Sequence, residues 1–155
     1  MPRVYNVNFE DVAVAAAQDL VLIVGAAGKQ LKIRKIWAAF TNTSLPTAQG
    51  LKFRGRFLPT TVTNGSGGAA ATPRPVDPGD AAATFTARVN DTTKATTSGT
   101  ATIPEEGGGH VYNPYERVFG APPQVGPSQA FVFELLSTPS GTLNLSGGVE
   151  VEEAG

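Results

Sequence analysis

The stretch "LKFRGRF", residues 51 to 57, decides the fold class, because its apolar and basic side chains alternate strictly. The odd positions are apolar or small and the even positions are basic: Leu51, Phe53, Gly55 and Phe57 against Lys52, Arg54 and Arg56. Successive side chains of a β-strand point to opposite faces of its sheet. The stretch therefore predicts a strand with one buried face and one basic face.

The same period of two residues recurs on both sides of this strand, and helical periodicity is nearly absent. "RVYNVNF" (3–9) alternates, whereas "LVLIV" (20–24) is apolar throughout, as in a strand buried on both faces. Further strands are predicted at 30–40, 84–89, 97–103, 110–119, 129–136 and 142–153. About eight strands separated by turn signals predict an all-β fold, an antiparallel β-sandwich for which the jelly roll is one arrangement. At 155 residues the chain fits a single domain, 1–155.

One strand changes its parity along its length. In "QLKIRKIWAAF" (30–40), the apolar residues Leu31 and Ile33 have odd numbers, but Ile36, Ala38 and Phe40 have even numbers and so belong to the opposite face. A strand with one buried face cannot change parity without an extra residue. The sequence therefore predicts a β-bulge near residues 34–35.

The connections divide into three kinds. "STPSG" (137–141) lies between two predicted strands and predicts a hairpin. Glycine-rich "NGSGG" (64–68) and "PEEGGG" (104–109) predict mobile, exposed loop tips. Proline-rich segments near 72–80 and at 121–127 predict stiff, extended straps. Asp80 could cap one helical turn over the three alanines that follow it.

Charge is unevenly distributed, although the net charge is only −1. Residues 20–76 contain eight basic residues and no acidic one, so the rest of the chain is strongly acidic. Such asymmetry indicates either an interaction surface or strands that neutralise each other within one sheet. The apolar run around residues 12–27 is interrupted by Gln18 and Asp19 and lacks the basic leader of a signal peptide. We therefore expect no export or membrane segment, and we expect the protein to be made in the cytoplasm. The absence of cysteine excludes disulfides and thiolate chemistry.

Motifs that could carry chemistry fail in their spacing or context. "GAAGK" (25–29) has too few residues between its glycines for a phosphate-binding loop, and a strand follows where a helix is needed. "GPSQA" (126–130) is similar to a hydrolase nucleophile elbow, but a strand follows it where that motif requires a helix. His110 is the single histidine, and the glutamates at 105–106 and 150–153 are expected to be solvated. We therefore expect no catalytic, cofactor-binding or metal-binding residues and no enzymatic activity.

The basic face of residues 51–57 could bind the phosphates of a nucleic acid. However, proteins that bind single-stranded nucleic acids need aromatic and basic side chains on one surface. Phe53 and Phe57 have the opposite parity from the basic residues. Direct nucleic-acid binding is therefore disfavoured, and an acidic protein surface fits the basic face better.

Three segments together resemble small virion proteins of tailed bacteriophages: "TPRPVDPGD", the following "ARVNDTTKAT", and the closing strand "LSGGVEVEE". Several proteins of this size in that group are capsid decoration or cement proteins, so the resemblance implies a structural role in the virion and the major capsid protein as partner. Opposite charges on one subunit favour self-association into a closed ring, most simply a trimer. The candidate interface residues are Lys52, Arg54, Arg56, Pro73, Arg74 and Pro75.

Two alternatives remain open. One is a tail or head–tail connector component of the virion, and the other is a carbohydrate-binding β-sandwich module. A sugar platform needs an exposed Trp or Tyr, and the only tryptophan, Trp37, lies inside an apolar run, which disfavours the second alternative.

Overall fold

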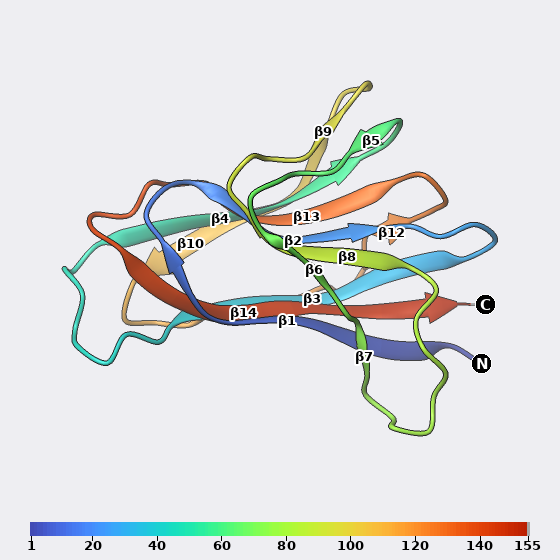
Figure 1. Ribbon diagram of the computed structural model, residues 1–155, viewed down its shortest axis with the longest axis horizontal. Helices are drawn as coiled ribbons and strands as arrows, with labels where there is room; N and C mark the ends of the chain where they lie inside the picture. Colours follow the sequence, from blue (N-terminus) through green and yellow to red (C-terminus); the bar gives the residue numbers. More distant parts are fainter. Residues whose placement is uncertain (155) are drawn as a thin grey trace.

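The computed structural model describes residues 1–154, which form fourteen β-strands and no helix (Figure 1). This confirms the all-β prediction. The strands are β1 (Arg3–Val14), β2 (Gln18–Val24), β3 (Gln30–Phe40), β4 (Gly50–Leu58), β5 (Val62–Thr63), β6 (Ala69–Ala71), β7 (Arg74–Pro75), β8 (Thr86–Asp91), β9 (Thr96–Thr97), β10 (Thr102–His110), β11 (Tyr115–Val118), β12 (Gln124–Val125), β13 (Ala130–Leu135) and β14 (Leu143–Ala154). Five of them contain only two or three residues, and the other nine are longer, against an expected number of about eight.

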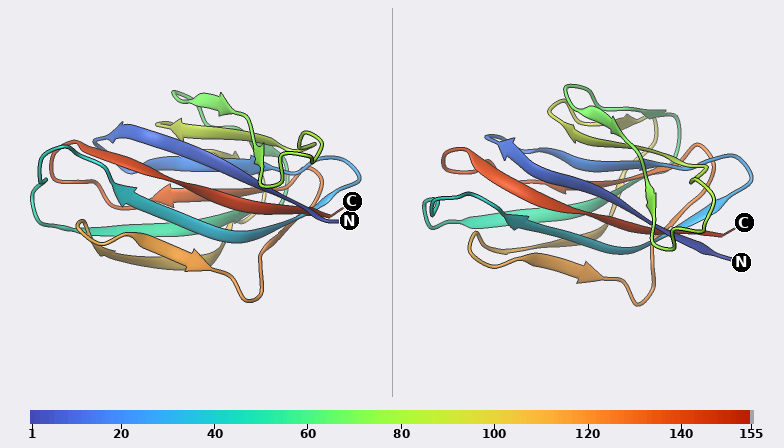
Figure 2. Two further views of the ribbon diagram at one scale, coloured as in Figure 1. Left: turned by 90° about the horizontal axis from the view of Figure 1, so that it is seen from below. Right: turned by 60° about the horizontal axis from the view of Figure 1, so that its bottom comes forward.

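The long strands form two antiparallel sheets in two layers (Figure 2). Sheet A has the order β11-β3-β14-β1-β7, with β12 also paired to β3, and sheet B has the order β10-β4-β13-β2-β8-β6. The pairing is nested: β1 pairs with β14, β2 with β13, β3 with β11 and β4 with β10. The first four strands thus meet the last four in reverse order, and this connectivity places the two termini side by side (Figure 1).

The main core lies between the sheets and contains the inward side chains of both. Tyr5 and Val149 of sheet A and Phe131 and Phe133 of sheet B are fully buried in it. The alternation predicted for residues 51–57 is confirmed at Leu51 and Phe53, which are buried, and at Lys52, which is exposed. Strand β2 is buried on both faces as predicted.

The second face of β2 packs on a smaller cluster outside sheet B. Leu22, Leu58, Ala130 and Val132 are buried there, with Val62 and other partly buried residues packed against them. The short β5–β9 pair lies beyond this face of sheet B (Figure 1). The central strands of sheet B, β2 and β13, are therefore covered on both sides, whereas sheet A is covered on one.

The parity change in β3 is accommodated by the predicted bulge. Glu150 of β14 pairs with Lys35 and the next residue, Val151, pairs with Ile33, so Arg34 is the extra residue. Ile33 and Ile36 are consequently both buried, although they differ in parity. The prediction of a bulge near residues 34–35 is confirmed.

The segment between β4 and β10 adds strands to both sheets. In sheet B, β8 pairs with β2 and β6 pairs with β8. Between β6 and β8 the chain crosses to sheet A, where β7 pairs with β1. The predicted proline-rich strap near 72–80 is this crossover. It ends in a turn at Asp77, whose carboxylate accepts a hydrogen bond from Gly79 N at 2.9 Å. The helical turn after Asp80 was predicted wrongly, because residues 81–83 form no helix.

Two connections also differ from the predictions, and a third, 64–68, differs in part, since only Gly65 of its residues is buried. The hairpin across 137–141 is wrong, since β13 belongs to sheet B and β14 to sheet A, and the segment crosses between them. Residues 104–109 are not a loop tip but part of β10 at the edge of sheet B. Residues 64–68 pack on β8 and the segment after it: Gly65 is buried and Gly68 N donates to Asp91 Oδ1 at 3.1 Å. Glycine serves in both places for close backbone approach, a use that composition cannot distinguish from loop flexibility.

The bulge predicts the effect of a deletion. Removing Arg34 should cost about 3 kcal/mol of unfolding free energy or more, because two buried side chains must turn to solvent when the register becomes continuous. The substitution Arg34→Ala keeps the register and should cost less than about 1 kcal/mol, since it removes only surface ion pairs. Urea unfolding of both variants measures the difference, and equal losses would contradict the role of the bulge.

Candidate functional site

The predicted basic face of β4 lies on the outer side of sheet B, but its three members differ in environment. Lys52 is exposed. The side chains of Arg54 and Arg56 are only 26% and 12% exposed, because β13 and the segment before β9 surround them. The structure therefore does not present the three bases as one solvated stripe.

Arg54 and Arg56 belong to a buried charge cluster, which we define as Asp19, Arg54, Arg56, Lys94 and Glu134. Glu134 of β13 is fully buried and lies opposite Arg54 on one side and Asp19 on the other. Its carboxylate accepts a hydrogen bond from Arg54 Nε and pairs with Lys94 Nζ at 2.9 Å. Arg56 Nη2 lies 3.2 Å from Asp19 Oδ1. The two acidic side chains are thus each paired with bases, and the three bases leave the cluster with one excess positive charge.

The cluster also fixes the segment that covers sheet B. Ala95 N donates to Asp19 Oδ2 at 2.7 Å, and Arg56 Nη1 donates to the Ala95 carbonyl at 3.0 Å. Both backbone groups of Ala95 are therefore held by side chains of sheet B. Since β9 begins one residue later, these bonds hold the β5–β9 pair against the outer face.

The pKa values of the two carboxyl groups of the cluster are shifted in opposite directions. Burial raises the pKa of Asp19 to about 6, despite the Ala95 N–H and the Arg56 guanidinium, which both favour the ionised form. For Glu134 burial also opposes ionisation, but the hydrogen bonds from Arg54 and Lys94 outweigh it and the pKa is lowered. Glu134 is therefore ionised and is the shared partner of Arg54 and Lys94, whereas Asp19 changes its protonation state near pH 6.

Ion pairs on sheet A account for three of the six other bases in the basic half of the chain. Lys32 pairs with Glu152 at 3.3 Å, and Lys35 pairs with Glu116 at 3.0 Å. Arg34 lies 3.5 Å from Glu150. The uneven charge of the sequence is thus largely neutralised between neighbouring strands, which was one of the two interpretations of the pattern. The charge patches that favoured a head-to-tail ring are correspondingly weak.

The remaining candidate interface residues lie in the crossover between the sheets. Arg74 and Pro75 form β7 and pair with Asn6 and Tyr5 of β1. Arg74 is exposed, whereas Pro73 and Pro75 are half-buried. These residues lie along the edge of their own sheet A, away from the basic residues of β4, so the structure does not bring the two candidate groups together.

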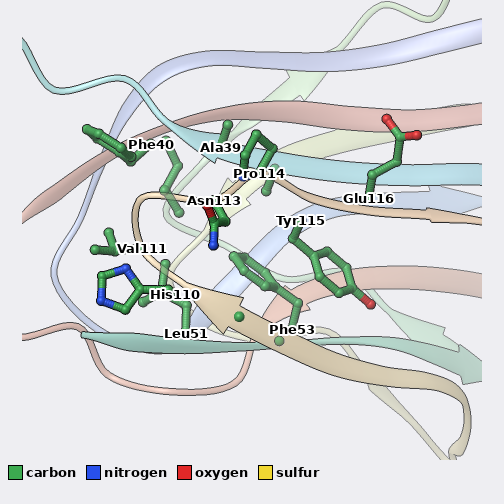
Figure 3. A pocket seen from close by; sticks show the side chains of 14 residues that line it. Ala39, Phe40, Leu51, Phe53, His110, Val111, Asn113, Pro114, Tyr115 and Glu116 are labelled. Atoms are coloured by element: carbon green, nitrogen blue, oxygen red, sulfur yellow. The ribbon is translucent and has the colours of Figure 1, made fainter. Parts of the chain in front are cut away.

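A cavity of about 260 Å³ opens between the sheets where β10 turns into β11 (Figure 3). Phe53 and Tyr115 stack along it with ring centroids 4.9 Å apart, and His110 lies at the opposite end from Tyr115. Tyr115 donates a hydrogen bond to Glu105 Oε1 at 3.1 Å. Burial, reinforced by this carboxylate, raises the pKa of Tyr115, so its hydroxyl is a donor and not a base. The cavity is thus lined by apolar and polar side chains together, with Leu51 and Phe53 beside His110 and Asn113.

Sequence reasoning missed Asp19, Lys94 and Glu134 as members of the site. Glu134 carried a signal, because it is the only charged residue in an otherwise apolar strand, "QAFVFELL". A charge in such a strand needs a buried partner. The identity of that partner could not be predicted, because it depends on which strands are neighbours.

Comparisons with protein-family models, with curated proteins and with solved structures found no match to this chain. Within residues 1–154, no three acidic or histidine side chains gather closely enough to hold a metal ion. Nor does any segment of the described chain form a helix that is long and apolar enough to cross a membrane.

The cluster predicts unequal effects of charge reversal along β4. Arg54→Glu and Arg56→Glu should each cost about 3 kcal/mol or more, because each leaves Glu134 or Asp19 buried beside a like charge. Lys52→Glu should change stability by less than about 0.5 kcal/mol, as expected for an exposed side chain. Urea unfolding tests this, with Lys52→Glu as the matched control, and comparable losses at all three positions would refute the cluster.

Asp19 predicts a pH dependence with a definite sign. Its pKa of about 6 in the folded protein exceeds the value of 3.8 for the free side chain, so the folded state binds more protons between these values. The contribution of Asp19 to stability is therefore full below pH 4 and is lost as the pH rises through 6, by up to about 3 kcal/mol. Asp19→Asn should abolish this component. Unfolding of both proteins between pH 4 and 7 measures it, and parallel curves would contradict the prediction.

Proposed function

We propose that the protein is a non-enzymatic structural subunit of a bacteriophage virion that decorates the capsid and reinforces the head. The observation that carries the proposal is the nested pairing of the first four long strands with the last four. We assign this arrangement to the jelly roll, a β-sandwich of eight principal strands: β1 to β4, β10, β11, β13 and β14. Viral capsid domains are among the proteins that use this architecture.

The resemblance of three sequence segments to virion proteins supports the proposal independently of the fold. Fold alone does not determine function, and lectins share the jelly roll. Arg54 and Arg56 of β4 and Glu134 of β13 are also engaged in holding the structure together, as expected of a part whose task is mechanical. Contact with the major capsid protein then falls to the exposed edges, loops and apolar side chains, such as Val118, which is 61% exposed.

The carbohydrate-binding alternative gains one observation, because Trp37 lies outside the core. It is half-buried and shares the parity of Lys35, opposite to that of the buried Ile36 and Ala38. However, Lys35 Nζ lies over the indole, 5.1 Å from its centroid, and also pairs with Glu116. A sugar would have to displace this lysine before it could stack on the ring, so we retain the structural role as the conclusion.

The proposal predicts where the protein is found in purified virions. It should be present in a copy number comparable to that of the major capsid protein and should remain on heads separated from their tails. Quantitative mass spectrometry of separated heads and tails measures both properties. Recovery with the tails or at the neck would support a tail or connector component instead, and absence from the particle would refute a virion role.

A further inference from the structure

The structure leaves the edge of one end strand, β10, unpaired along its whole length. β10 is at the end of sheet B and pairs only with β4, and it spans nine residues. The other end strands of the two sheets, β6, β7 and β11, have three, two and four residues. Proteins usually protect such an edge, because its free N–H and C=O groups can pair with another chain.

Protection is confined to the first half of β10. Pro104 and a shift in register between Thr102 and Glu105 interrupt pairing there. The carboxylate of Glu105 is held by Tyr115 Oη and by Arg117 Nε, at 3.1 and 3.2 Å. From Glu106 to His110 the strand has a regular register and exposed residues, Gly107 excepted. The second half of β10 is thus a regular, exposed strand edge with which another strand can pair.

The direction of the backbone groups in this half follows from the pairing with β4. Val111 N donates to the Gln49 carbonyl, one position beyond the pair His110–Gly50. Hydrogen-bonded and non-hydrogen-bonded pairs alternate along an antiparallel ladder. Gly109 and Gly107 therefore bond to β4, while the N–H and C=O groups of Glu106, Gly108 and His110 point outward. The His110 carbonyl is already used by Asn113 N within the turn.

We infer that this edge is a twofold interface in which β10 of a second copy of the chain pairs antiparallel with β10, centred on Gly108. This register places Glu106 of each copy opposite His110 of the other, so that a carboxylate acceptor meets an imidazole N–H donor twice. It also uses the outward backbone groups, with about four hydrogen bonds between groups that are free in a single copy. A two-residue slip would remove the Glu106–His110 match, so this side-chain pair selects the register.

The surroundings leave room for the second strand. Gly107–Gly109 carry no side chains that could obstruct it, and the groove of about 540 Å³ over the adjoining outer face of β4 and β10, bounded by Lys52, Glu106 and Ser137, leaves that face uncovered. An isologous contact of this kind closes on itself as a dimer. The inference does not depend on the virion role, because it uses only the edge and its side chains.

Charge exchange tests the interface in the full chain. Glu106→Lys and His110→Glu should each weaken dimerisation about tenfold or more, because each reversal changes two cross-strand pairs. The double variant Glu106→Lys/His110→Glu should restore affinity to within about threefold of the wild type. Glu10→Lys, an equal charge change on exposed β1, is the matched control and should leave dimerisation unchanged. Sedimentation equilibrium over a range of protein concentrations measures the dissociation constants.

Amide hydrogen exchange supplies a second readout that does not depend on the charged side chains. The N–H groups of Glu106 and Gly108 should exchange at least about tenfold more slowly under conditions where the protein is dimeric than after dilution to monomer. A wild-type protein that remains monomeric at millimolar concentration overturns the inference. So does an oligomer that both single reversals leave intact, or one in which the double variant dissociates as the single variants do.

Discussion

The burial of the central strands of sheet B on both faces is the constraint on which the rest of the structure depends. These strands, β2 and β13, face the main core on one side and the β5–β9 pair on the other. A strand in that position cannot hold a charge unless partners compensate for it. Glu134 and Asp19 are such charges, and the bases of β4 together with Lys94 are their partners. The covering segment and the charge cluster therefore require each other.

This dependence changes the meaning of the basic face on β4. In the sequence, Lys52, Arg54 and Arg56 form a regular basic series, and alternation alone assigns them to solvent. In the structure, only Lys52 keeps that position, because the long connection between β4 and β10 returns over the other two. Replacing such a buried network by apolar residues of similar volume is often neutral or favourable, whereas breaking it is costly. We interpret the network as a device that fixes where the covering segment docks.

The parts of the fold that follow from local chemistry could be predicted from the sequence. Alternation located most of the long strands, and the parity change located the bulge at Arg34. Predictions that required knowledge of strand neighbours were less successful. Residues 137–141 have the composition of a hairpin but connect the two sheets, and residues 104–109 have the composition of a loop but form an edge strand. The buried charge cluster was missed for the same reason, since its members are distant in sequence.

The treatment of the sheet edges follows from the nested order of the strands. In such an order the middle of the chain forms the outermost pairs, and each sheet has two ends that need protection. At one side the long connection provides it, because β6 and β7 are short and the proline-rich crossover lies along β1. At the other side, β11 has four residues and is continued along β3 by β12. Only β10 combines length, regular register and bare glycines, so the fold directs any further strand pairing to that edge.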